Sequence, residues 1–212
     1  MPNWCNNHVT LTHKDPAMIK RAYDALERGE FLNEFIPVPK DLTETVSGFL
    51  GDGEAQKELE RKTAENIEKY GYGNWYDYCV GEWGTKWDVG QDGSTDVHPD
   101  GKILHTYFDS AWAPPINAYV KLTEMGFTVG AMYYEPGMAY CGIWEDGNDD
   151  YYDLSGMRSH DVEDTIPSDL DEAFSISESM REYEEENAED EDLTEWLKDG
   201  KEANDKLALV AK

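Results

Sequence analysis

The feature that most constrains the fold of this chain is the stretch Phe108–Pro115, where a strand pattern passes directly into a helix pattern. Residues 102–108 mix β-branched and aromatic side chains, whereas apolar side chains recur at helical spacing over residues 116–122. The two prolines that end the stretch suit a first helical turn, because the N–H groups of that turn have no intrahelical partner. The sequence therefore predicts a strand, a turn with Trp112 at its corner, and a helix.

Other segments with strand or helix periodicity surround this unit. The predicted strands are residues 8–12, 85–89, 102–109, 127–134 and 138–144, and the predicted helices are 16–28, 54–70, 75–83 and 116–125. Without the helical insertion at about residues 54–83, the order begins β-α-β-β-α-β, which is the split arrangement of a ferredoxin-like fold. We therefore predict an α+β domain over residues 1–145, with a ferredoxin-like antiparallel sheet and inserted helices. Residues 31–39 are expected to form an apolar loop.

Charge divides the chain. It carries 46 acidic and 18 basic residues, a formal net charge of −28. Residues 1–145 hold 23 acidic and 12 basic residues, whereas residues 146–212 hold 23 and 6, which predicts an acidic, mainly helical C-terminal region. So strong a negative charge repels phosphate backbones and attracts basic surfaces, so we expect a basic protein partner and no direct binding of nucleic acid.

Cysteine usage and hydropathy indicate the compartment. Cys5, Cys79 and Cys141 are widely spaced, and the polar start is no secretory signal, which together predict a cytoplasmic protein. No apolar run approaches the roughly 18 residues typical of a membrane span, so no membrane insertion is expected. The sequence sets no oligomeric state.

Four separate stretches resemble one family. They are Met1–Asn7, Trp83–Asp88, Phe108–Pro115 and Tyr133–Gly137. In this order they are similar to the YubB-type ferredoxin-like proteins of phages and conjugative plasmids, over roughly residues 1–145. The resemblance implies a ferredoxin-like fold and a mobile-element protein acting in the cytoplasm of a bacterial host. It implies no catalytic residue, because the function of the family is unassigned, and the acidic tail departs from its short members.

Two constellations with catalytic or metal-binding chemistry are present but incomplete. Cys5 and His8 form a Cys-x-x-His pair without a second closely spaced pair, so the cysteines are interpreted as small buried hydrophobes and no metal site is predicted. Asp109 and Glu135, with His105 near, are an acid–base possibility, but Asp109 also suits a cap for the turn. Because no nucleophile–base spacing and no Gly-rich phosphate loop is present, we predict no enzyme and no cofactor.

Tryptophans gather near the family-like stretches and have two interpretations. The five are Trp4, Trp75, Trp83, Trp87 and Trp112. They either fill the core or stack on the bases of a ligand, and basic residues that would hold phosphates are few. If a ligand face exists, the residues expected on it are Trp87, Trp112, Asp109 and Glu135.

The acidic region also has two interpretations, a solvated segment or a recognition surface for a basic protein. Aromatic side chains among the acids favour recognition, because aromatic residues are enriched at interface hot spots. The residues predicted to bind the partner are Asp149, Asp150, Tyr151, Tyr152, Asp153, Tyr183, Glu184, Glu185, Glu186, Glu189, Asp190, Glu191, Asp192 and Trp196.

Three functions follow, from different classes. The first is a phage or plasmid accessory protein that binds and inhibits a host defence or nucleic-acid-handling protein, with its acids in place of DNA phosphates. The second is a module that binds and sequesters a nucleotide or another small ligand on its tryptophan-rich face. The third, ranked lowest, is a nucleotide hydrolase.

Overall fold

The computed structural model describes residues 3–90 and 95–187. The chain divides into two compact units, Met1–Ser155 and Gly156–Lys212. None of the helices in the described ranges is both long enough and apolar enough to cross a membrane.

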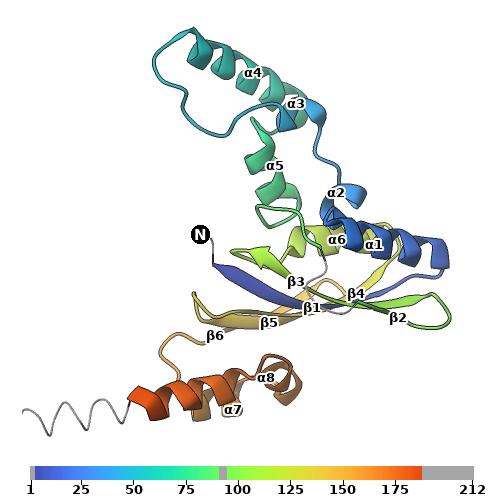
Figure 1. Ribbon diagram of the computed structural model, residues 1–212, viewed down its shortest axis with the longest axis vertical. Coiled ribbons are helices and arrows are strands. Elements are labelled where there is room, and N and C mark those ends of the chain that lie inside the picture. Colours follow the sequence, from blue (N-terminus) through green and yellow to red (C-terminus); the bar gives the residue numbers. More distant parts are fainter. Residues whose placement is uncertain (1–2, 91–94, 188–212) are drawn as a thin grey trace, which may run out of the picture. The chain divides into compact units, whose positions relative to one another are not determined.

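The first unit is built on a six-stranded antiparallel sheet with the strand order β2-β3-β1-β4-β5-β6 (Figure 1). The strands are β1 (Trp4–Thr12), β2 (Asp96–Val97), β3 (Ile103–Ala111), β4 (Thr128–Glu135), β5 (Tyr140–Glu145) and β6 (Asn148–Asp153). The helices are α1 (Pro16–Arg28), α2 (Phe31–Phe35), α3 (Lys40–Thr43), α4 (Glu54–Tyr70), α5 (Trp75–Glu82) and α6 (Ile116–Glu124). The predicted α+β architecture with an antiparallel sheet and inserted helices is therefore confirmed.

The main core lies between one face of the sheet and the helices α1 and α6 (Figure 1). Alternate residues of β1 are buried, and its Val9 and Leu11 belong to the same core cluster as Ile19 and Leu26 of α1. That helix begins where the Asp15 carboxylate accepts a hydrogen bond from the Ala17 N–H at 2.9 Å. It ends at Gly29, whose φ of 69° is easily adopted by glycine. Local capping and one apolar stripe thus account for this helix.

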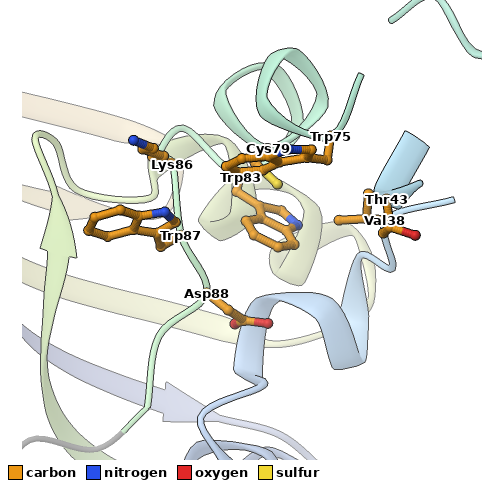
Figure 2. Close-up of a pocket in the computed structure, with 8 residues that line it drawn as sticks. All are labelled: Val38, Thr43, Trp75, Cys79, Trp83, Lys86, Trp87 and Asp88. Carbon is orange, nitrogen blue, oxygen red and sulfur yellow. The ribbon is translucent and has the colours of Figure 1, made fainter. Parts of the chain in front are cut away.

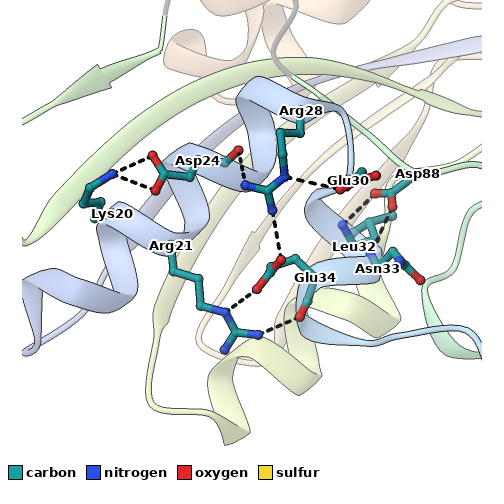
Figure 3. A network of polar contacts seen from close by, with 9 residues as sticks. All are labelled: Lys20, Arg21, Asp24, Arg28, Glu30, Leu32, Asn33, Glu34 and Asp88. Atoms are coloured by element: carbon teal, nitrogen blue, oxygen red, sulfur yellow. Dashed lines mark hydrogen bonds and ion pairs between the residues drawn. The ribbon is translucent and has the colours of Figure 1, made fainter.

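The helical insertion begins earlier than the predicted residue 54. The stretch predicted as an apolar loop, residues 31–39, contains the short helix α2, and the short helix α3 follows directly after it. Figure 3 shows how α2 is attached: Glu34 pairs with Arg21 at 2.6 Å and with Arg28 at 2.9 Å, both on α1. The Asp88 carboxylate accepts the N–H groups of Leu32 and Asn33 at the start of α2. Partners distant in the sequence therefore stabilise a helix that local periodicity does not indicate.

The strand predicted at residues 85–89 is wrong. These residues form an irregular loop after α5, and the strand that pairs with β3 on its outer side is the two-residue β2. The polar side chains of the loop bind backbone groups of other elements: the Thr85 hydroxyl donates to the Ala111 carbonyl at 2.9 Å, and Asp88 accepts from α2. The alternation of polar and apolar residues over 85–89 therefore arises because the polar side chains attach a loop to neighbouring elements, not because the residues form a strand.

The structure also differs from the predicted domain boundary at residue 145, because the sheet continues through β6. A two-residue loop, Asp146 and Gly147, joins β5 to β6, and both residues have positive φ, 48° and 88°. Asp-Gly is a favoured sequence for such a hairpin turn, so the signal was present in the sequence. The acidic composition of β6 concealed it.

The second unit is helical in its described part. It comprises α7 (Ser159–Thr165), α8 (Ser168–Phe174) and a helix over residues 176–187. Val162, Leu170 and Ile176 are buried.

Candidate functional site

The four family-like stretches meet at one end of the sheet. Trp4 at the start of β1 pairs with Ala111 at the end of β3, and Glu135 at the end of β4 pairs with Tyr140 at the start of β5. The hydrogen bond from Thr85 to Ala111 attaches the loop after α5 to the same place. We call this end, formed by residues 4–7, 83–88, 109–112 and 135–140, the motif end.

A buried polar network holds the motif end together. The Asn7 side chain donates to the Cys5 carbonyl at 2.8 Å and to the Ser110 hydroxyl at 2.9 Å, and it accepts from the Tyr119 hydroxyl at 3.3 Å. The Ser110 hydroxyl donates to the Ala113 carbonyl at 2.8 Å, beyond the turn. A buried amide with its partners in place fixes its surroundings, because each partner would otherwise be left unsatisfied. The network therefore fixes the chain on both sides of Trp112.

Trp112 has an unusual backbone conformation. Its φ is 70°, in the left-handed region that side chains larger than that of glycine rarely adopt. Its N–H donates to the Asn3 carbonyl at 2.9 Å, and its carbonyl accepts from the Tyr140 hydroxyl at 2.8 Å. The indole is nevertheless 41% exposed. Such backbone strain is concentrated at functional sites in proteins, so this exposed tryptophan indicates a role other than packing.

Aromatic rings surround the ammonium group of Lys86. Its Nζ lies 4.7 Å from the ring centroid of Trp87, 5.0 Å from that of Trp112 and 5.9 Å from that of Tyr76. Trp4 extends the group, with its ring 5.8 Å from that of Trp87. We call Trp4, Tyr76, Trp87 and Trp112 the aromatic cluster. Distances below about 6 Å are those of attractive cation–π contacts.

A pocket of about 360 Å³ adjoins the aromatic cluster (Figure 2). It is lined by Val38, Thr43, Trp75, Cys79, Trp83, Lys86, Trp87 and Asp88. In the view of Figure 2, Trp83 lies between Trp87 on one side and Val38 on the other.

One helix cap and one indole hydrogen bond position these walls. The Asn74 side chain accepts from the N–H groups of Tyr76 and Asp77, which starts α5 and orients its Trp75. The Trp83 indole N–H donates to the Ile36 carbonyl at 2.9 Å, which fixes the central ring. The walls are thus held by interactions outside the pocket.

The polar groups in the pocket differ in whether other protein groups already bind them. The Asp88 carboxylate accepts backbone hydrogen bonds from residues 32, 33 and 89, at 2.7 to 3.0 Å. Burial raises the pKa of Asp88, and burial raises the pKa of the Cys79 thiol to about 12, so this thiol stays protonated at neutral pH. Among the described residues, no carboxylate forms an ion pair with Lys86. The pocket is chemically suited to binding by stacking and by one positive charge.

The structure brings together half of the predicted ligand face. Trp87 and Trp112 both contact Lys86. Asp109 instead lies on the sheet face opposite its buried neighbour Ser110 and accepts a hydrogen bond from Asn6 at 2.6 Å. Glu135 is fully buried and accepts the N–H groups of Gly137 and Met138, so it caps the turn after β4. The two carboxylates are used locally and do not form an acid–base pair.

The acids of β6 lie on an edge strand of the sheet. Asp149 accepts from the Tyr133 hydroxyl at 2.7 Å, Asp150 from Asn148 at 2.8 Å, and Asp153 from the Ser155 N–H at 2.9 Å. Tyr151 is 56% exposed and stacks near Tyr140, with 5.4 Å between the ring centroids. Tyr152, the remaining predicted residue of this strand, is half-buried.

In the second unit, the predicted residues lie on the helix over residues 176–187. Glu184 accepts the N–H and the hydroxyl of Ser159, both at 2.9 Å, and these hydrogen bonds lower its pKa. It therefore stabilises the start of α7. Tyr183, Glu185 and Glu186 are exposed. The predicted partner-binding residues Glu189, Asp190, Glu191, Asp192 and Trp196 lie outside the described residues.

The Cys-x-x-His pair does not converge on a metal site. Cys5 is buried toward the helices, whereas His8, three residues along the same strand, projects from the other face. Within residues 3–90 and 95–187, no group of three or more His, Cys, Asp or Glu side chains is arranged to hold a metal ion.

The expected ligand face, Trp87, Trp112, Asp109 and Glu135, does not include Lys86, Trp75 or Trp83, although Trp75 and Trp83 are among the tryptophans with a possible stacking role. The available signal was Trp-Gly-Thr-Lys-Trp-Asp at residues 83–88, where two tryptophans flank a lysine. It was interpreted as strand periodicity, and loop contacts between distant residues are not encoded in a local period.

Comparisons with known proteins give little further information. No family model and no curated protein matches the chain. The crystal structure of a protein named api92 from Yersinia pseudotuberculosis, with the family model DUF1281, is similar to 72% of this chain and 98% of that protein. The sequence identity is 13% and the TM-score is 0.38, a similarity that carries no argument about fold or function.

Proposed function

We propose that this chain is a non-enzymatic binding protein that takes up a small ligand at the motif end and sequesters it. The observation that carries this proposal is the pocket of about 360 Å³ with Trp75, Trp83 and Trp87 in its walls and Lys86 at the aromatic cluster. Ligand pockets are typically concave, mainly apolar and provided with a few polar groups that orient the ligand.

Binding is favoured over catalysis by the state of the pocket's reactive groups. Asp88 is held by backbone N–H groups, and the Cys79 thiol is protonated at neutral pH. Three backbone N–H donors stabilise the charged form of Asp88 and oppose its uptake of a proton, which a general base requires. A thiol nucleophile needs a lowered pKa, whereas burial raises that of Cys79.

The proposal includes the fold family and the origin. The strand order β2-β3-β1-β4, with α1 and α6 as the two crossover helices, supports a ferredoxin-like unit extended by β5 and β6. The resemblance of the four motifs supports a phage or plasmid accessory protein in the cytoplasm of a bacterial host.

Thermal-shift screening of the full chain against a panel of nucleotides and other small anionic and neutral aromatic metabolites tests the function. A ligand that binds only the native state raises the melting temperature, and at 100 times its Kd it adds about 2.7 kcal/mol of stability. A panel member that stabilises wild type but not Trp87→Ala supports the proposal. If no member of the panel stabilises wild type, the proposal fails.

A second candidate is favoured by the acidic edge of the sheet. Asp149, Asp150 and Asp153 lie on β6 without a basic residue among them, and Tyr151 is exposed beside them. This arrangement supports binding and inhibition of a host nucleic-acid-handling protein, with the acids of β6 in place of phosphates. The acids Glu184, Glu185 and Glu186 of the second unit are a separate candidate surface for such a partner. The partner would have a basic surface, and neither nucleic acid nor membrane would bind directly.

Capture from host lysate at rising salt tests this candidate. Because salt screens exposed charges, a partner held by acidic residues elutes early. The triple variant Asp149→Asn, Asp150→Asn and Asp153→Asn is expected to lose it, whereas Trp87→Ala retains it. Equal recovery of the same partners by wild type and the triple variant would reject the candidate.

A further inference from the structure

We propose that the ligand of the motif-end pocket is a mononucleotide, with its base stacked on the indoles and its phosphate paired with Lys86. This inference rests on the proposed function and names its ligand class.

The shape and lining of the pocket fit a planar heteroaromatic ring. A volume of about 360 Å³ is at the lower end of the range for small-molecule sites, roughly 300 to 1,000 Å³. Three of its eight lining residues are tryptophans. Every nucleobase has a flat π-face, and stacking on an aromatic side chain contributes to binding with little dependence on sequence. The exposed Trp87, 39% accessible, offers one such face at the mouth.

Lys86 provides the charge for an anion. Most basic side chains in the described part of the chain are neutralised by carboxylates, as in the pairs of Lys20 with Asp24 and Lys69 with Asp41. The Lys86 ammonium instead contacts the aromatic cluster and is half-buried. Rings do not cancel its charge, and partial removal of water strengthens its attraction for an anion. A lysine ammonium binds phosphate as a point charge, which matches a terminal phosphate.

The Asp88 carboxylate in the pocket repels a phosphate bound at Lys86 only weakly. The two oxygens of Asp88 are directed at backbone N–H groups, with Leu32 at 2.7 Å and Asn33 at 3.0 Å. These N–H donors partly neutralise the negative charge of the Asp88 carboxylate.

A single nucleotide fits the electrostatics better than a polynucleotide. Binding of a phosphate backbone requires many basic residues along its path, and the net charge of −28 opposes it. One phosphate at one lysine avoids most of this repulsion.

Isothermal titration of the full-length protein with adenosine 5′-monophosphate, adenosine and inorganic phosphate separates the two parts of the proposal. We expect the monophosphate to bind more tightly than adenosine by about ten-fold, which is the effect of one favourable charge contact. Trp87→Ala should weaken both by about ten-fold or more. Lys86→Gln should weaken only the monophosphate, to the level of adenosine, and Lys86→Arg should restore its preference.

Matched controls exclude effects of net charge and folding. Lys102→Gln changes the net charge as Lys86→Gln does, directly before the start of β3 and thus at the end of that strand opposite the motif end, and should leave both affinities within two-fold. Phe49→Ala removes an exposed ring that does not line the pocket and should do the same. Equal affinity for adenosine and its monophosphate in wild type would overturn the inference while leaving the proposed function intact. Failure of all three probes, with stabilisation by a different ligand of the panel, also overturns only the inference.

Discussion

The motif end and the acidic edge strand β6 differ in how their polar side chains are held: those of the motif end are buried in a hydrogen-bond network, whereas those of β6 lie at the surface. At the motif end, Asn7 and Ser110 are 1% exposed and are bound by several partners from distant parts of the chain. On β6, Asp149 accepts a hydrogen bond from Tyr133 of β4, whereas Asp150 and Asp153 accept only from residues two positions away in the sequence. The first arrangement fixes geometry, whereas the second maintains charge at a surface.

This difference indicates where specific recognition takes place. A rigid site keeps exposed rings in place with little loss of entropy on binding, which favours a defined ligand. An exposed row of acids attracts any basic surface, and like charges on an edge strand also discourage pairing with other strands. The motif end is therefore the better candidate for specific recognition.

Thiol labelling gives the largest expected contrast between the two regions. Cys5 and Cys79 are buried, and burial raises the pKa of each to about 12. We expect both to react with iodoacetamide at pH 8 at least about 100-fold more slowly in the native protein than in urea, because native reaction requires opening of the fold. A cysteine introduced by Asp150→Cys on β6 should react promptly in the native protein. Rapid native labelling of Cys5 would contradict the closed motif end.

Removal of the buried amide should have the next largest effect. Asn7→Ala leaves the Tyr119 hydroxyl without its acceptor and removes one donor to the Ser110 hydroxyl, and we expect a loss of about 2 to 4 kcal/mol in the free energy of unfolding. The matched change Asn148→Ala, at the start of β6, should cost less than about 0.5 kcal/mol. Urea unfolding of the two variants measures both values. Equal costs would remove the distinction between the regions.

Trp112→Gly separates binding from stability within the motif end. Glycine adopts a φ of 70° without strain, which offsets the lost ring contacts, so stability should change by less than about 1 kcal/mol. Binding of the ligand should weaken by about ten-fold, because one face of the aromatic cluster is lost. Thermal unfolding and titration on the same samples test this. Unchanged affinity would exclude Trp112 from the site.

Neutralisation of the edge strand should have the smallest effect on the fold. Asp150→Asn retains the side-chain shape and is expected to change the free energy of unfolding by less than about 0.5 kcal/mol. The variant should instead affect the second candidate function. At low salt Asp150→Asn should capture less of a basic partner than wild type does, and at high salt the two should capture equal amounts. A large loss of stability would show that the Asp150 carboxylate is needed for the fold.

The fold was predictable from the sequence where periodicity and caps act locally. The helix after Asp15 and Pro16 is an example, since one capping carboxylate and one apolar stripe define it. The loop at residues 83–88 was not predictable, because Thr85 and Asp88 are held by backbone groups about 26 and 56 residues away. The Asp-Gly dipeptide before β6 is a hairpin signal that the sequence contains, but the acidic residues after it do not resemble a strand.

The candidate site was predictable only in part, for the same reason. Trp87 and Trp112 are predicted as possible ligand contacts from their motifs. The role of Lys86 depends on the rings that surround its ammonium group in the fold, and the local sequence does not indicate them. Asp109 is expected on the ligand face as a near neighbour of Trp112, and Glu135 as a residue close to it in space, but the strand alternation and the turn direct both elsewhere. Side-chain convergence is a tertiary property that single-sequence patterns do not carry.

The most direct test of the central claim is a ¹H–¹⁵N spectrum of the tryptophan indole N–H groups, recorded while adenosine 5′-monophosphate is added. The seven tryptophans of the chain give one signal each, assigned by substitution. We predict saturable shifts for Trp75, Trp87 and Trp112, with the signal of Trp144, buried against Tyr119, unchanged. Shifts confined to Trp196, or no saturable shift at the motif end for this or any ligand of the panel, would contradict the account.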